Sequence, residues 1–202
     1  MPTTAGYREA VVRLLRERGY VRRDEPFQLS SGEWSQDYVD GKRALAAGPA
    51  LRTAAEAVIA MAADAGARFD AVGGLTMGAD PLAHAVAVVS GASWFSVRKQ
   101  AKGHGRRQLV EGAALGPDTA VLLLEDVITT GGSVLQALDA VEATGAPVVL
   151  VTTLLDRGDQ AAARLAARGV PYAPLATYRD LQIAPVGANP SAEPVPESGI
   201  GG

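Results

Sequence analysis

Two adjacent carboxylates follow the most apolar run of the chain, in the stretch VLLLEDVITTGGS at residues 121–133. Neighbouring like charges repel each other, so Glu125 and Asp126 are poor choices for a core and suit a ligand better. Five small residues come after them: Thr129, Thr130, Gly131, Gly132 and Ser133. Glycines let backbone N–H groups converge on an anion, and the start of a following helix adds partial positive charge. The stretch therefore predicts a phosphate cradle beside two hydrogen-bond acceptors.

A phosphorylated sugar would satisfy both halves of this site. Carboxylates accept hydrogen bonds from hydroxyls, so ring hydroxyls would bind Glu125 and Asp126 while the phosphate occupies the loop. The alternative interpretation is an ordinary strand–helix turn with surface acids. A Walker A loop is excluded because this loop has no Lys. The stretch GGLTMG at 73–78 also fails the dinucleotide fingerprint, since Leu75 occupies the place of the second Gly.

A second candidate is the basic stretch RKQAKGHGRR at 98–107, where six of ten residues are Arg, Lys or His. It could be a solvated surface loop or a lid that closes over an anion, with Gly103 and Gly105 giving it flexibility. A nucleic-acid patch is disfavoured because no aromatic residue is interleaved with the cations. The anion lid complements a phosphate cradle.

Bulk composition narrows the class of protein. The 202 residues are 48% hydrophobic and 20% charged, which is typical of one globular domain. A net charge of −3 argues against a nucleic-acid partner. The absence of cysteine excludes disulfides and thiolate sites and favours a cytoplasmic location. We expect no membrane partner, because the N-terminus lacks the pattern of a signal peptide and no apolar stretch reaches roughly 18 residues.

Hydrophobic periodicity predicts an alternation of strands and helices. Helices are expected at 4–18 (capped by Thr4), 49–66, 80–90, 133–145 and 159–169. Strands are expected at 69–74, 93–97, 120–126, 147–156 and, weakly, 170–177. The segment 20–45 is mixed, with turn signals at Pro26 and Gly32. This alternation indicates a parallel sheet covered on both faces, with ligands at its carboxyl edge.

Both chemical motifs resemble those of a known family. VLLLEDVITTGGS resembles the phosphoribosyl-diphosphate-binding motif of type I phosphoribosyltransferases, and VRKQAKGHG (97–105) is similar to the catalytic loop of orotate phosphoribosyltransferases. The resemblance implies an α/β fold of the type I phosphoribosyltransferase kind, with a central, mostly parallel sheet flanked by helices. We expect a single domain over 1–182, in which about 1–45 forms a small hood, and a disordered tail over 183–202.

The resemblance also implies an activity. The protein would transfer the phosphoribosyl group of 5-phosphoribosyl 1-diphosphate to orotate, giving orotidine 5′-monophosphate and diphosphate. Mg²⁺ would be the cofactor, held mainly by substrate oxygens and water, with no direct protein ligand assigned. A homodimer with shared active sites is implied, because part of the loop reaches the neighbouring subunit in that family. The alternatives are transfer to another base, such as uracil or a purine, and a non-catalytic sensor of phosphoribosyl diphosphate.

Residue roles follow from the matching positions. Lys99, Lys102, His104 and Asp126 would be catalytic, with Lys102 stabilising charge on the leaving diphosphate and His104 a candidate general acid. The segment 27–45 is similar to the family's hood, where Tyr38 would lie over the base. The segment 73–87 resembles its pyrophosphate loop, and Arg157 in LLDR would pair bidentately with the orotate carboxylate. The implied substrate-binding set is Arg98, Glu125, Val127, Thr129, Thr130, Gly131, Gly132, Ser133, Arg157, Tyr38, Thr76 and Met77.

The chain departs from the family pattern at several positions. Met77 stands where many relatives carry Lys or Arg, and Ser30 where some carry Lys. Gln36 and Asp37 replace a Pro and an aromatic residue before Tyr38. Glu125 replaces the commoner first Asp of the acid pair and keeps an acceptor.

Five further residues are interpreted without a catalytic role. His84 lies in an apolar helix pattern and is expected to be structural, and Trp34 and Trp94 are expected to pack. Lys42, like its neighbour Arg43, could belong to a solvated turn or could support the hood.

Overall fold

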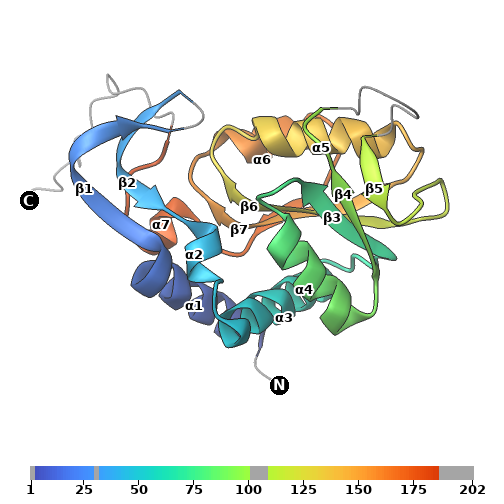
Figure 1. Cartoon of the computed structure of the whole chain (residues 1–202), viewed down its shortest axis with the longest axis horizontal. Helices are drawn as coiled ribbons and strands as arrows, with labels where there is room; N and C mark the ends of the chain where they lie inside the picture. Colours follow the sequence, from blue (N-terminus) through green and yellow to red (C-terminus); the bar gives the residue numbers. More distant parts are fainter. Residues whose placement is uncertain (1–2, 30–31, 101–108, 187–202) are drawn as a thin grey trace, which may run out of the picture.

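A six-stranded sheet forms the centre of the molecule, in a computed structural model that describes residues 3–29, 32–100 and 109–186 (Figure 1). The strand order is β5-β4-β3-β6-β7-β8, and all pairs are parallel except β4 with β5. The strands are β3 (Ala71–Leu75), β4 (Ser93–Val97), β5 (Val110–Gly112), β6 (Val121–Ile128), β7 (Val148–Asp156) and β8 (Tyr172–Pro174). The expected α/β fold with a mostly parallel sheet is confirmed.

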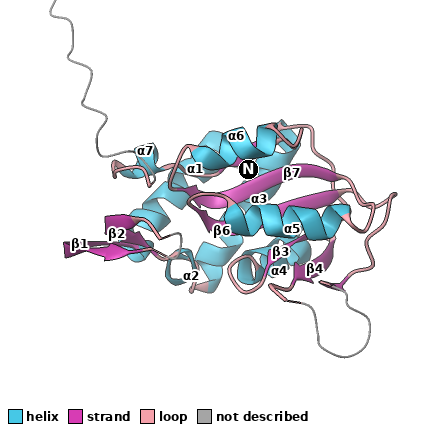
Figure 2. Cartoon of the chain, turned by 90° about the horizontal axis from the view of Figure 1, so that it is seen from above, coloured by secondary structure: helices cyan, strands magenta, loops and turns pink. Residues whose placement is uncertain are grey.

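Helices cover both faces of this sheet (Figures 1 and 2). They are α1 (Thr4–Leu14) with its π-helical end (Leu15–Gly19), α2 (Gly41–Ala44), α3 (Gly48–Asp64), α4 (Asp80–Ser90), α5 (Gly132–Glu142), α6 (Gln160–Ala166) and α7 (Tyr178–Leu181). Leu122 and Leu124 of β6 belong to the core cluster under α1, α3 and α4, while Val121 and Leu123 belong to the cluster under α5 and α6. Successive strand residues point to opposite faces, so a strand buried on both sides requires the unbroken aliphatic run seen in the sequence.

The segment 20–45, for which the sequence pattern predicts only mixed structure with turns, contains two paired strands. Strands β1 (Tyr20–Gln28) and β2 (Trp34–Val39) pair antiparallel in a separate two-stranded sheet, here called the hood hairpin. Its pairing register shifts between Arg22 and Phe27, and β1 is mostly exposed. A charged, exposed strand that contains a Pro lacks the alternation that marks a strand in sequence, which explains why the pattern missed it.

Smaller corrections concern caps and ends. Thr3, not Thr4, caps α1, because its hydroxyl accepts a hydrogen bond from the Gly6 N–H at 3.2 Å. Strand β6 continues to Ile128, two residues beyond the predicted end. The tail was expected from residue 183, yet Val186 is buried and its N–H donates to the Arg157 carbonyl. Residues 187–202 of that predicted tail lie outside the described residues.

Two of the packing assignments can be compared with the structure. Trp34 is 68% exposed on the hood hairpin, so its expected packing role is wrong. Trp94 lies partly buried against the core, as expected, and its ring centroid is 4.6 Å from that of His84. In the part of the chain that the structure describes, no helix combines the length and apolar character needed to cross a bilayer.

Candidate active site

The two carboxylates lie at the carboxyl end of β6, the strand between β3 and β7. Glu125 is only 5% exposed, and its Oε1 accepts a hydrogen bond from the Asp126 N–H at 3.2 Å. Asp126 is half-buried, and its Oδ1 accepts from the Val127 N–H at 2.8 Å. A Cβ at Gly78 would lie 2.7 Å from Glu125 Oε1 and 2.8 Å from Asp126 Oδ1. The loop between β3 and α4 therefore packs directly against both acids, and a larger residue at position 78 would force their carboxylates to move.

Burial changes the protonation behaviour of Glu125. Loss of water around Glu125, together with the negative charge of Asp126, raises the pKa of Glu125 to about 8. At neutral pH Glu125 therefore mostly keeps its proton and can donate a hydrogen bond, whereas an ordinary Glu would only accept. Asp126 has a cationic partner, since Lys42 Nζ lies 2.9 Å from its Oδ2. That hydrogen bond raises the pKa of Lys42, so the lysine stays charged.

The predicted phosphate cradle has the local geometry of an anion site. Gly131 adopts a left-handed conformation (φ 82°), and α5 begins at the next residue. Since Gly131 has no side chain to cap the helix, the first N–H groups of α5 remain for a ligand. Arg164 Nη1 donates to the Thr130 carbonyl at 2.6 Å and braces the loop from α6. The sequence prediction of a glycine-rich turn into a helix is confirmed here.

A cleft of about 690 Å³ joins the cradle to the hood hairpin, a size suited to a small ligand. Its lining comprises Arg23, Phe27, Gln28, Leu29, Tyr38, Val39, Asp40, Gly41, Lys42, Lys99, the continuous run 125–134, and Arg157. The fold thus brings together most of the predicted site residues from segments that are far apart in the chain.

The hood contributes an aromatic lip to this cleft. The rings of Phe27 and Tyr38 meet edge to face, with centroids 5.7 Å apart. The guanidinium of Arg23 lies 4.4 Å from the Phe27 centroid and 5.8 Å from that of Tyr38. Planar rings beside a cleft can cover a flat base, and the cation adds attraction through the ring faces.

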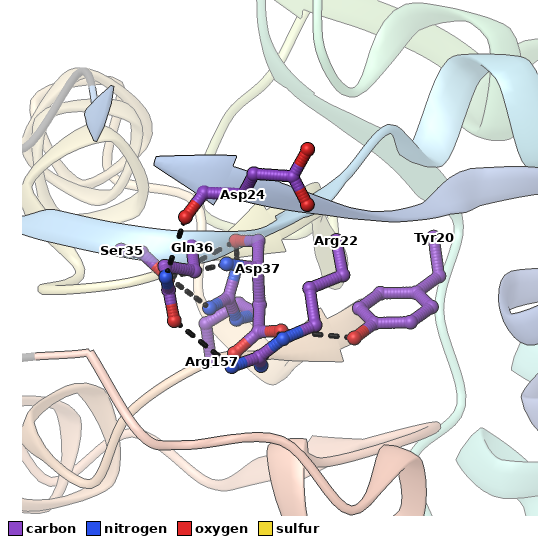
Figure 3. Close-up of polar contacts among 7 residues, drawn as sticks. All are labelled: Tyr20, Arg22, Asp24, Ser35, Gln36, Asp37 and Arg157. Atoms are coloured by element: carbon purple, nitrogen blue, oxygen red, sulfur yellow. Dashed lines mark hydrogen bonds and ion pairs between the residues drawn. The ribbon is translucent and has the colours of Figure 1, made fainter. Parts of the chain in front are cut away.

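Arg157, which follows the end of β7, also lines the cleft, and Figure 3 shows its contacts with Ser35 and Asp37 of the hood hairpin. It is 1% exposed, and it donates to the Asp37 carbonyl at 2.9 Å and to Ser35 Oγ at 3.3 Å. Its Nε is buried and has no hydrogen-bond partner in the structure. Within the described residues no carboxylate lies within ion-pair distance of its guanidinium. Burial lowers the pKa of Arg157, which remains a cation. A buried cation without an ion-pair partner is stabilised by binding an anion.

The remaining predicted residues belong either to the loop between β3 and α4 or to the basic segment 98–107. Thr76 and Met77, joined by a cis peptide bond, do not line the cleft, and Met77 is 74% exposed; their loop reaches the site through Gly78. Arg98 forms an ion pair with Glu111 at 3.2 Å, whereas Lys99 lines the cleft and its carbonyl accepts from Gln136 Nε2 at 2.9 Å. The predicted Lys102 and His104 lie outside the described residues.

Lys42 is one of several cleft residues that sequence reasoning did not assign to the site, and Arg23 and Phe27 of the aromatic lip are others. Lys42 follows the N-cap Asp40 of the short helix α2, and it approaches Asp126 from 84 positions away in the chain. A basic residue directly after the hood segment was the available signal, but a solvated turn has the same appearance in sequence.

Taken together, an acid pair, an anion cradle at a helix start and a hood over the cleft define a site for a phosphorylated sugar and a flat second ligand. Residues 42–170 match the model of the phosphoribosyl transferase domain, and the chain belongs to this family.

Within this family, the chain is similar to several orotate phosphoribosyltransferases. The orotate phosphoribosyltransferase of Streptomyces avermitilis is 45% identical over 150 residues, covering 71% of this chain and 81% of the relative. That of Sorangium cellulosum is 40% identical over 184 residues, covering 87% and 93%. The crystal structure of Mycobacterium tuberculosis orotate phosphoribosyltransferase in complex with 5-phospho-α-D-ribosyl 1-diphosphate has a TM-score of 0.72 and 35% identity, covering 88% of this chain and 99% of that one.

Proposed function

We propose that this protein is an orotate phosphoribosyltransferase that serves pyrimidine nucleotide synthesis. The bond between ribose C1 and the diphosphate oxygen breaks, and a bond from C1 to orotate N1 forms. Diphosphate leaves with the electron pair of the broken bond, and the proton lost from orotate N1 passes to the departing diphosphate or to water. The observation that carries the choice of acceptor is the buried Arg157, which lines the cleft, lacks a carboxylate partner among the described residues and has an unpaired Nε. A planar acceptor with a carboxylate supplies the missing anion.

The donor is bound by the end of β6 and the loop that follows. The N–H groups at the start of α5 and the hydroxyls of Thr129, Thr130 and Ser133 receive the 5′-phosphate. The ribose hydroxyls contact the acid pair. Asp126 accepts, whereas the largely protonated Glu125 can donate as well as accept. A carboxylate beside a group that both donates and accepts fits two neighbouring hydroxyls.

The acceptor lies between Arg157 and the aromatic lip of the hood. Arg157 is rigid because strand β7 and two hydrogen bonds to β2 hold it, so little entropy is lost when it binds a carboxylate. Tyr38 covers the ring and helps to exclude water from the reacting centre. Water exclusion matters because water would hydrolyse the donor.

Mg²⁺ is the proposed cofactor, and the residues of the site are compatible with it. Within the described residues there is no cluster of three or more His, Cys, Asp or Glu that could hold a metal. The oxygens of Asp126 and Glu125 are hard ligands, but they are too few to enclose an ion. Mg²⁺ would therefore be held mainly by donor oxygens and water, with Asp126 beside it, and it would supply charge neutralisation of the diphosphate.

The basic segment 98–107 is proposed as the lid of the active site. We further propose that the protein is a homodimer with shared active sites and that it is located in the cytoplasm. Lys99 already lines the cleft at the start of the segment, and the Arg98–Glu111 and Gln136–Lys99 contacts anchor that end. Cations delivered to the leaving diphosphate, Lys102 among them, stabilise the transition state more than the ground state. Cysteine-free composition is compatible with a reducing compartment.

An absorbance assay with orotate, phosphoribosyl diphosphate and Mg²⁺ tests the function. Orotate consumption that depends on the donor is expected. Turnover of uracil or a purine base in place of orotate would contradict the acceptor. Donor binding without turnover of any base would instead indicate a sensor.

A further inference from the structure

A buried carboxylate lies next to the acceptor-binding arginine without pairing with it (Figure 3). Asp37 is 3% exposed, and its main-chain carbonyl accepts the hydrogen bond from Arg157 Nη1. Its side chain is not within ion-pair distance of the guanidinium, although Asp37 is the acid whose charge acts on Arg157. Opposite charges this close in a poorly solvated region attract each other strongly, so another interaction must hold the carboxylate away.

Two residues of the neighbouring strand hold it. Asp37 Oδ1 accepts from the Tyr20 hydroxyl at 2.9 Å and from Arg22 Nη1 at 3.0 Å. Arg22 lies directly opposite Asp37 in the pairing of β1 with β2, so its position is set by the sheet itself. The carboxylate thus has both a neutral and a charged donor.

The second restraint, Arg22, is itself fixed. Its Nη2 donates to Gln36 Oε1 at 2.9 Å, and Gln36 Nε2 donates to the Asp24 carbonyl at 2.9 Å. The guanidinium is therefore bound on two sides although its side chain is largely exposed to solvent. The chain Asp24–Gln36–Arg22–Asp37 keeps a surface arginine in one geometry, which an isolated surface ion pair would not achieve.

We propose that Tyr20 and Arg22 are positioning residues that sequester the Asp37 carboxylate, so that Arg157 stays free to bind the carboxylate of the acceptor. This inference rests on the proposed function. A buried acid beside Arg157 would otherwise be an internal competitor for the acceptor. Its restraint by β1 removes the competition and leaves its carbonyl to orient Arg157.

The inference predicts a specific failure. Without the Tyr20 hydroxyl or the Arg22 guanidinium, the Asp37 side chain can turn to Arg157, and orotate must displace it. The contact that orotate must displace is a hydrogen bond between the Asp37 carboxylate and the Arg157 guanidinium. Breaking a charged hydrogen bond of this kind should raise the orotate KM about tenfold. The kcat at saturating orotate and the KM of phosphoribosyl diphosphate should stay within about twofold, because the donor half of the site is untouched.

The experiment measures both KM values and kcat for wild type, Tyr20→Phe, Arg22→Met and Arg22→Lys. Two double variants add Asp37→Asn to Tyr20→Phe and to Arg22→Met. Arg52→Met, at an exposed i,i+4 pair on α3, is the matched control for loss of an arginine. Thermal melting shows whether each variant is folded. Tyr20→Phe and Arg22→Met each test the proposal alone, so one of them suffices if the other does not fold.

The expected result is a raised orotate KM in Tyr20→Phe and Arg22→Met, a smaller change in Arg22→Lys, and return to the wild-type KM in both double variants. An unchanged orotate KM in the folded single variants overturns the proposal. So does a rise that persists after Asp37→Asn, because that would mean general damage to the hood. Absence of orotate turnover by the wild type would overturn the proposed function itself. Wild-type turnover with an unchanged orotate KM in the variants would overturn only the inference about Tyr20 and Arg22.

Discussion

Lys42 Nζ lies 2.9 Å from Asp126 Oδ2, and this ion pair ties the short helix after the hood hairpin to the end of the central strand. Lys42 thereby places a positive charge beside the acid pair, which lies at the partly buried end of β6. The site therefore offers a cation before any ligand arrives.

Replacement of Lys42 by Met should therefore weaken donor binding. Without the cation, the Asp126 carboxylate loses its ion-pair partner and repels a donor that carries several negative charges, so the KM for phosphoribosyl diphosphate should rise about tenfold. Steady-state kinetics with varied donor measures this. Arg43→Met is the matched control, because Arg43 is exposed beside Lys42 and does not line the cleft. An equal effect in both variants would show that only general surface charge matters.

Gly78→Ala should strongly reduce activity while leaving the fold largely intact. The added Cβ would lie 2.7 and 2.8 Å from carboxylate oxygens of Glu125 and Asp126, so both acids must move from their positions beside the donor. Displacement of this size should lower kcat/KM for the donor by roughly a hundredfold. Kinetics and thermal melting together test it, with Gly116→Ala as control because nothing lies within 4 Å of its added Cβ. Full activity in Gly78→Ala would contradict the placement of the acid pair.

The buried Glu125 should make stability depend on pH. Its pKa is about 8 in the folded protein against an ordinary value of 4.5, so between these values the folded state holds a proton that the unfolded state has released. Stability therefore falls as pH rises through this window, and the loss is complete above about pH 8. Glu125→Gln removes this dependence.

Thermal melting of both proteins at pH 5, 6.5 and 8 measures the effect. Because the glutamine cannot ionise, the variant should gain stability relative to wild type as pH rises, by on the order of a few kcal/mol across the window. Parallel pH profiles of the two proteins would show that Glu125 titrates normally.

Lys102→Ala should lower kcat far more than it changes donor affinity, since a lid cation acts mainly on charge that develops in the transition state. Asp126→Asn should inactivate the site by a different route, through loss of a ribose contact. If lids are shared between subunits, an equal mixture of the two variants regains about a quarter of wild-type activity after subunit exchange. No recovery once exchange has been demonstrated would mean that each subunit closes its own site.

Local patterns in the sequence were enough for the framework of the catalytic half. An aliphatic run, an acid pair and a glycine-rich turn before an amphipathic helix describe consecutive residues, and β6, its loop and α5 appear where they were expected. These features are decided by backbone preferences and by burial on both faces of a parallel sheet, which neighbours in sequence express directly.

Only the tertiary structure decided how that half becomes a site. Arg157 meets the carbonyl of Asp37 across 120 positions, and Lys42 meets Asp126 across 84. The raised pKa of Glu125 comes from the water that packing excludes. The hood hairpin itself carries no alternating pattern, because its strands are stabilised by cross-strand polar contacts and by docking on the core. Contacts between distant segments and the loss of solvent around a charge depend on the whole packed chain, and no short stretch of sequence contains them.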